Sequence, residues 1–159
     1  MQITYKPIGI IRTPFAKRES IPAIAIRSSA SGRVEIYPQY RPALADLDGF
    51  SHIILLYHFH QSGPARLTVR PFLDSAEHGV FATRHPARPN PIGLSVVRLD
   101  RVEMSESPVL HVTGIDVLDR TPLLDIKPYA PPFDQHPATR VGWLAKHISS
   151  RPWLANFDT

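Results

Sequence analysis

Short runs of apolar and β-branched residues recur along the chain, and proline, glycine or polar residues bound each run. Such runs are typical of β-strands. We predict strands over Ile3–Arg12, Gly32–Tyr37, Ser51–His60, Arg66–Arg70, Leu94–Met104, Val109–Ile115 and Leu123–Ile126. The strands on either side of Ser105–Pro108 are expected to form a hairpin.

The most apolar run, Ser51–His60, is predicted to be a central strand. Alternation along a strand places Ile53, Leu55 and Tyr57 on one face. His58 and His60 fall together on the other face. Two histidines can bind a metal, but no third ligand stands at a spacing that completes a site, so ligand-contacting or structural histidines are favoured and no metal is expected.

Helical signals are few. A glycine-closed turn is predicted over Leu44–Gly49, and apolar residues at helical spacing predict a helix over Ala138–Ser149, with Trp153 and Phe157 anchoring the tail. The expected fold is all-β dominated: a small single-domain β-barrel over residues 1–137, with one C-terminal helix and tail, residues 138–159, packed on it.

Composition narrows the class of protein. Of 159 residues, 43% are hydrophobic and 20% charged, which indicates a globular domain. Cysteine is absent, which excludes disulfides, thiolate metal sites and a cysteine nucleophile. The net charge of +4, mostly from arginine, permits an anionic partner without requiring one. No apolar run nears the roughly 20 residues of a membrane span and no signal-peptide pattern opens the chain, so we expect no membrane contact and a cytoplasmic location.

A stiff polar loop runs from Gly79 to Leu94 and contains three prolines. Each proline fixes its own φ and biases the preceding residue toward extended backbone. Much of the entropy of ordering the loop is thereby removed in advance, as suits a site for a polar or anionic ligand. A rigid surface turn is the alternative. The segment Phe15–Ser31 is predicted to be a long loop, which in a compact domain often covers a site.

The common enzyme motifs are missing. The chain has no phosphate-binding glycine loop, no nucleophile elbow and no zinc-binding histidine pair with an intervening glutamate. Polar residues at strand ends remain as candidates, together with the stiff loop. They are His60, Gln61, Arg84, Arg88, Asn90, Asp116, Asp119, Asp125, Lys127 and Tyr129.

Several separated motifs resemble those of the TsaA/TrmO family. They are Ile-Gly-Ile-Ile-Arg-Thr-Pro-Phe at 8–15, Gly-Phe-Ser-His at 49–52, Phe-His-Gln at 59–61, Gly-Val-Phe-Ala-Thr-Arg at 79–84, Arg-Pro-Asn-Pro-Ile-Gly-Leu-Ser at 88–95, Leu-Asp at 118–119 followed by Thr-Pro, and Asp-Ile-Lys-Pro-Tyr at 125–129. One departure is Arg120, which stands where the family commonly has glycine.

The resemblance implies a β-barrel methyltransferase that uses S-adenosylmethionine and is usually a homodimer with the cofactor near the subunit interface. The activity it implies is methylation of N6 of threonylcarbamoyladenosine, beside the anticodon of tRNA. Carried over by motif, the implied cofactor contacts are His60, Gln61, Arg84, Leu94, Thr113, Gly114, Ile115 and Asp116.

The implied reaction sets a requirement on the protein. The acceptor nitrogen of a carbamoylated adenine is a weak nucleophile because its lone pair is delocalised, so a nearby proton acceptor would help. Our candidates for the catalytic residues are Asn90 and the group Asp125, Lys127 and Tyr129. Two alternatives stay open: a non-catalytic β-barrel that binds nucleic acid or a nucleotide, and a methyltransferase for another RNA or a small molecule.

Overall fold

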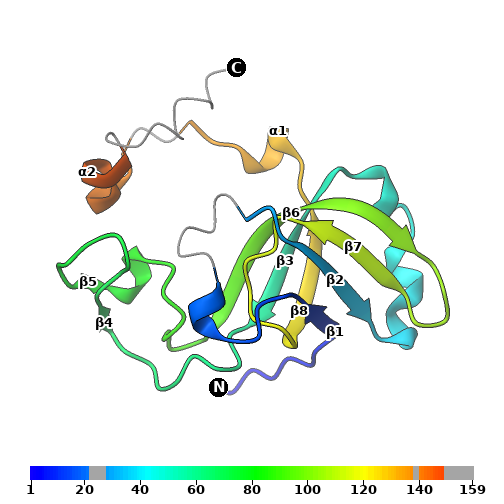
Figure 1. Ribbon diagram of the computed structural model, residues 1–159, viewed down its shortest axis with the longest axis horizontal. Coiled ribbons are helices and arrows are strands. Elements are labelled where there is room, and N and C mark those ends of the chain that lie inside the picture. Colours follow the sequence, from blue (N-terminus) through cyan, green and yellow to red (C-terminus); the bar gives the residue numbers. More distant parts are fainter. Residues whose placement is uncertain (22–27, 138–139, 149–159) are drawn as a thin grey trace.

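The structure is a computed structural model that describes residues 1–21, 28–137 and 140–148, and its main body is a closed barrel of six antiparallel strands (Figure 1). The barrel strands are β1 (Gly9–Arg12), β2 (Ser31–Ile36), β3 (His52–His58), β6 (Ile92–Glu103), β7 (Val109–Thr113) and β8 (Thr121–Pro128). Their order around the barrel is β1-β2-β7-β6-β3-β8, and β8 pairs with β1 to close it. The predicted strand-dominated barrel is confirmed.

A second, smaller sheet lies beside the barrel (Figure 1). It pairs β4 (Thr68–Val69) with β5 (His78–Gly79), and we call residues 66–88 around it the side lobe. The remaining elements are short helices: the 3-10 helices η1 (Arg18–Ser20), η3 (Pro38–Leu44), η4 (Leu47–Gly49), η5 (Val80–Ala82) and η6 (Gly142–Leu144), and the α-helices α1 (Pro131–Asp134) and α2 (Ala145–Ile148). Helices this short agree with the high proline content.

The barrel interior follows from residue alternation along the strands. On β3, Ile53, Leu55 and Tyr57 are at most 3% exposed, as predicted, while the residues between them face outward. On β6 the outward positions are apolar as well: Ile92, Leu94 and Val96 are 40%, 48% and 42% exposed. The barrel therefore has an apolar core and also an apolar stripe on its outer wall.

Two predicted strands are much shorter in the structure. The first strand starts at Gly9 rather than Ile3, and residues 1–7 are exposed. The predicted strand at Arg66–Arg70 is reduced to Thr68–Val69, and its partner β5 was not predicted. The hairpin is confirmed, with β6 pairing with β7 from Arg98 to Glu103.

The predicted long C-terminal helix is wrong within the described residues. Gly142 has φ +58°, a left-handed conformation that a continuous α-helix does not contain, and the helical structure described in this segment is η6, which begins at Gly142, and the four residues of α2. Apolar spacing alone did not reveal this break. The predicted anchors Trp153 and Phe157 lie outside the described residues, as do residues 138, 139 and 149.

Candidate functional site

A cavity of about 140 Å³ opens where four segments meet at one end of the barrel. The segments are η1, the residues that follow β3, the stiff loop, and the turn between β7 and β8. Representative lining residues are Arg18, His60, Gln61, Pro86, Asp116 and Thr121. Three predicted cofactor contacts, His60, Gln61 and Asp116, therefore line one cavity although they come from distant parts of the sequence.

Asp116 ends a chain of buried polar groups that reaches into the barrel. The Ser95 hydroxyl donates a hydrogen bond to Asp116 Oδ1 over 2.6 Å, and the Tyr57 hydroxyl lies 2.9 Å from Ser95 Oγ. Burial raises the pKa of the Asp116 carboxyl, while the hydrogen bond from Ser95 opposes the rise. Burial also raises the pKa of the Tyr57 phenol, and the negative charge of Asp116 adds to that rise. The tyrosine therefore stays protonated.

The Tyr57 ring packs against a position where only glycine fits. In the β3–β6 pairing Tyr57 faces Gly93, and a Cβ added at Gly93 would lie 2.1 Å from Tyr57 Cε2. The same Cβ would lie 2.8 Å from Cζ of Phe59, whose ring meets Tyr57 edge-on at 5.4 Å. The Ile-Gly-Leu-Ser stretch therefore presents a glycine and a serine to the interior and two apolar side chains to the outside.

Among the ionisable residues that line the cavity, His60 lies nearest to β3 in the sequence. Burial lowers the pKa of its imidazole, and the positive charge of His58 lowers it further. Gln61 Nε2 lies 3.4 Å from His60 Nε2. A neutral histidine beside an amide offers both donors and acceptors to a ligand. Across the described residues, no group of three or more His, Cys, Asp or Glu is placed to hold a metal ion.

The stiff loop is held in shape by Arg88. Its Nη1 donates to the carbonyl oxygens of Val80 at 3.0 Å and Thr83 at 2.7 Å, and the guanidinium lies 5.8 Å from the centre of the Phe81 ring. Arg84 is exposed, and its positive charge lowers the pKa values of both Tyr57 and Asp116. The hydrogen bonds of Arg88 thus stabilise the conformation of the stiff loop itself.

Asn90 lies at the other end of the loop, directly before β6. Its side chain is exposed, and its carbonyl accepts the amide of Ile92 over 2.7 Å. Within the described residues, the side-chain amide of Asn90 makes no hydrogen bond. Its candidate role rests on its place in the loop.

The turn between β7 and β8 is fastened to the first strand. Thr13 Oγ1 donates to the Val117 carbonyl over 2.8 Å, and Thr13 N donates to Asp119 Oδ1 over 3.0 Å. Arg120 in this turn adopts φ +64°, the left-handed conformation that glycine would take without strain. Arg120 thus occupies a backbone position that glycine would adopt at lower cost.

The other predicted contacts in this region have different surroundings. Thr113 donates to Asp100 Oδ2 over 2.7 Å on the barrel surface, and Gly114 N donates to the Ala30 carbonyl over 3.0 Å with φ +94°. Ile115 is fully buried in the core. Within this segment, Asp116 alone lines the cavity.

The predicted catalytic group lies on the outer wall of the barrel. Asp125 pairs with Leu56 of β3, which pairs in turn with Leu94 of β6, so the three lie in one row across the wall. Lys127 Nζ is 2.8 Å from Asp125 Oδ2, and their side chains are 58% and 47% exposed. Tyr129 donates its amide to the His52 carbonyl, and the two rings meet edge-on at 6.3 Å. The structure thus separates Leu94, Asp125 and Lys127 from the cavity by the wall of the barrel.

Sequence reasoning missed Tyr57 and Ser95. Both face the interior, and strand alternation already placed Tyr57 on the inward side of β3. An inward serine on β6, two residues after a glycine, was a further signal for a buried polar contact, because a buried hydroxyl needs a partner. The partner itself could not be read from the sequence, because Asp116 is 21 residues away.

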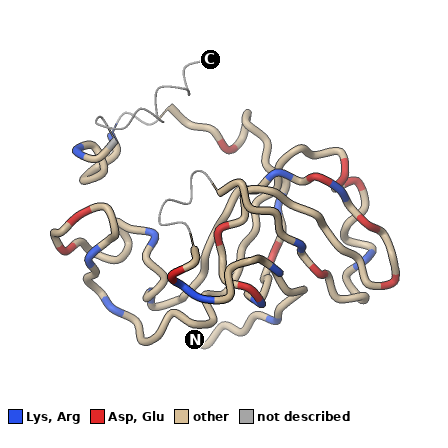
Figure 2. The backbone as a smooth tube through the Cα atoms, viewed as in Figure 1, with Lys and Arg blue, Asp and Glu red and all other residues tan. Residues whose placement is uncertain are grey.

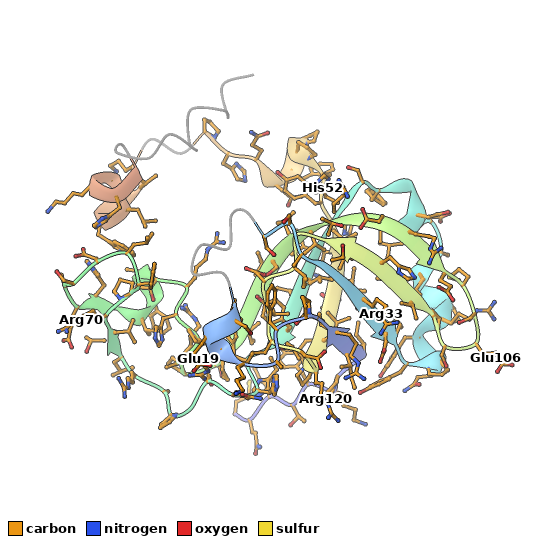
Figure 3. The ribbon with its side chains drawn as sticks, in the orientation of Figure 1. Glu19, Arg33, His52, Arg70, Glu106 and Arg120 are labelled. Carbon is orange, nitrogen blue, oxygen red and sulfur yellow. The ribbon has the colours of Figure 1, made fainter. Side chains whose placement is uncertain are left out.

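Acidic and basic residues are interspersed along the backbone (Figure 2). In Figure 3, Arg70 marks the side lobe, Arg33 marks β2, and Arg120 marks the turn before β8. A second hollow, of about 570 Å³, is lined by cations and carboxylates together, among them Arg12, Arg33, Asp100 and Asp119. The described part of the chain contains no helix long and apolar enough to cross a membrane.

Known proteins are similar to this chain in sequence and in fold. The chain is 49% identical over 152 residues to a probable S-adenosyl-L-methionine-binding protein of Pyrococcus abyssi, covering 93% of this chain and 79% of the relative. It is 41% identical over 135 residues to the tRNA (adenine(37)-N6)-methyltransferase of Escherichia coli, covering 80% of this chain and 57% of that enzyme.

A crystal structure of TrmO superposes with a TM-score of 0.72 at 43% identity, covering 89% of this chain and 64% of that one. The chain thus spans less than two thirds of the length of the TrmO structure and of the Escherichia coli enzyme. The family model for the tRNA-methyltransferase O N-terminal domain matches residues 10–135, a range that contains the cavity and, apart from Gly9, all the barrel strands. The chain belongs to this family.

Proposed function

We propose that this chain is an S-adenosylmethionine-dependent methyltransferase that modifies tRNA at N6 of threonylcarbamoyladenosine beside the anticodon. One observation carries the proposal: the family match over residues 10–135 contains a cavity whose walls include His60, Gln61 and Asp116. The named relatives support both halves of it, one as an S-adenosyl-L-methionine-binding protein and one as a tRNA methyltransferase. Because tRNA is the proposed substrate, we propose that the enzyme acts in the cytoplasm.

The cavity residues suit such a cofactor. A partly buried carboxylate at Asp116 can accept hydrogen bonds from ammonium or hydroxyl groups, and it complements a positively charged sulfonium ligand. His60 and Gln61 offer further polar contacts beside the ring of Phe59. When bound, the cofactor supplies an electrophilic methyl group. The protein would contribute chiefly by positioning the two reactants and by excluding water from the cavity.

A second copy of the chain would bury an apolar surface that one subunit leaves exposed. The cavity of about 140 Å³ is smaller than the roughly 300–1,000 Å³ common for nucleotide-sized ligands, so the described residues enclose only part of one. The apolar stripe formed by Ile92, Leu94 and Val96 is the kind of surface that a subunit interface buries. We therefore propose a homodimer that covers this outer wall.

The same dimer gives the remaining candidate residues a role. Asp125, Lys127 and Leu94 share the outer wall with the stripe, so a partner that covers the stripe would also bring its own groups beside them. Asp125 is our candidate proton acceptor, because Lys127 is paired with it and Tyr129 follows on the same strand end. Asn90, which precedes the stripe, is the candidate contact to the acceptor base.

The test is a methylation assay on the purified chain. Unmethylated tRNA that carries threonylcarbamoyladenosine would be incubated with S-adenosylmethionine, and its nucleosides would be analysed by mass spectrometry. A mass increase of one methyl group on threonylcarbamoyladenosine alone supports the proposal. Methylation of another nucleoside indicates a different RNA substrate, and binding of S-adenosylmethionine without methylation of any RNA indicates a binding module or a small-molecule substrate.

A further inference from the structure

Three polar side chains from separate elements form one hydrogen-bonded chain inside an apolar barrel. Tyr57 of β3 is 3% exposed, Ser95 of β6 is 7% exposed, and Asp116 closes the chain at the cavity wall. Apart from Tyr57, the buried polar side chains among the described residues are Ser95 and Thr121, and Thr121 bonds to the backbone carbonyl of Leu118. Ser95 differs because it joins two other side chains.

The direction of the hydrogen bonds follows from counting protons. A serine hydroxyl has one hydrogen, and Ser95 gives it to Asp116 Oδ1 over 2.6 Å. Tyr57 must therefore donate to Ser95 Oγ across the 2.9 Å contact. Both donors point toward the carboxylate, and hydrogen bonds aligned in this way polarise and strengthen one another. The chain thus stabilises the ionised form of Asp116.

The buried surroundings of Asp116 oppose its ionised form, so the charge needs a stabilising partner. Burial raises the pKa of Asp116 and so favours its neutral form. Three features oppose this effect: the hydrogen bond from Ser95, a hydrogen bond from the backbone amide of Asp116 itself, and the charge of Arg84 in the stiff loop. The other titratable groups at the cavity are His60, whose pKa is lowered by burial, and Arg18 of η1. Within the part of the chain that the structure describes, Ser95 is the only side chain that donates a hydrogen bond to the Asp116 carboxylate.

We propose that Tyr57 and Ser95 are positioning residues: they fix one oxygen of the Asp116 carboxylate and hold its charge, so that the carboxylate accepts a hydroxyl or ammonium donor of the bound cofactor. The inference rests on the proposed function for the identity of that ligand. It assigns an active role to two residues of the barrel interior. Gly93 belongs to the same arrangement, because its missing side chain makes room for the Tyr57 ring.

The experiment measures the affinity for S-adenosylhomocysteine by calorimetry across a pH series, in wild type and variants. For wild type, affinity should rise as pH increases through the raised pKa of Asp116, because the ionised form is the one that binds. Ser95→Ala should weaken binding about tenfold at neutral pH, the cost of one hydrogen bond to a charged group. It should also move the midpoint of the affinity rise to higher pH. Tyr57→Phe should do the same to a smaller extent.

Two controls separate positioning from general damage. Ser95→Thr keeps the hydroxyl and should retain the wild-type midpoint, and Ser105→Ala removes a hydroxyl at the distant β6–β7 turn and should change nothing. Circular dichroism checks that each variant is folded. A Ser95→Ala protein with an unchanged midpoint, or with equal weakening at every pH, overturns the proposal.

A second readout needs no ligand. Carbon-13 NMR of the Asp116 carboxyl group in the free protein should show a higher titration midpoint in Ser95→Ala than in wild type. An unchanged midpoint overturns the positioning role whatever the binding data show. If wild type fails to bind S-adenosylhomocysteine at any pH, the proposed function fails, and so does the ligand assigned to Asp116. The carboxyl titration still decides whether Ser95 holds the charge.

Discussion

Replacing Arg88 by alanine should loosen the stiff loop and weaken cofactor binding without any loss of a direct ligand contact. Arg88 Nη1 donates to the carbonyls of Val80 and Thr83 over 3.0 and 2.7 Å, so it joins η5 to the middle of the loop. Arg84 and Pro86 lie between Thr83 and Arg88 in the chain. Their position therefore depends on these two hydrogen bonds.

The size of the effect follows from the contacts. A hydrogen bond from a charged donor contributes roughly 1.5–3 kcal/mol, so two set an upper limit of about 3–6 kcal/mol. Arg88 is partly exposed, and water can reach part of the freed carbonyl surface, which reduces the expected loss to about 2 kcal/mol. For a domain of this size that loss corresponds to a fall in Tm of about 4–8 °C.

The assay combines thermal unfolding with calorimetric binding of S-adenosylhomocysteine. Arg88→Lys is the matched control: it keeps the charge and can reach one carbonyl but lacks the planar guanidinium, so its Tm should fall between those of wild type and Arg88→Ala. Hydrogen exchange should increase at the amides of residues 80–88. An Arg88→Ala protein with wild-type Tm and wild-type affinity would refute the reasoning, because it would show that the loop keeps its shape without the hydrogen bonds of Arg88.

Further substitutions test other parts of the structure. Gly93→Ala should lower the free energy of unfolding by about 1–3 kcal/mol in denaturant titrations, because the new methyl group would overlap the Tyr57 ring. Arg120→Gly should raise the free energy of unfolding by about 1 kcal/mol in the same titration, since φ +64° is unstrained for glycine; a loss of stability would show that the arginine side chain compensates for its backbone. Arg84→Ala should raise the dissociation constant for S-adenosylmethionine, and an unchanged constant would contradict its placement at the cofactor. Asp125→Asn should sharply reduce the turnover of tRNA while leaving the affinity for S-adenosylmethionine intact, and full activity would remove Asp125 from the mechanism.

The barrel could be predicted because its determinants are local. Alternation along β3 and the turn signals around the hairpin are visible within ten residues of sequence. The C-terminal helix was predicted wrongly for the opposite reason: Val141 and Leu144 have helical spacing, but the conformation of Gly142 between them overrides it. The site could be predicted from the sequence only in part, because contacts such as Ser95 to Asp116 depend on how β6 and the β7–β8 turn meet in space.

The loop that leads into β6 shows why neighbouring motif residues need not share a site. Once the chain enters the strand, successive side chains point to opposite sides of the barrel wall. Gly93 and Ser95 face inward, where one makes room for Tyr57 and the other bonds to Asp116. Ile92 and Leu94 face outward onto the apolar stripe. One short motif therefore supports two surfaces, the cavity and the outer wall, and a change in the register of β6 by a single residue would disrupt both together.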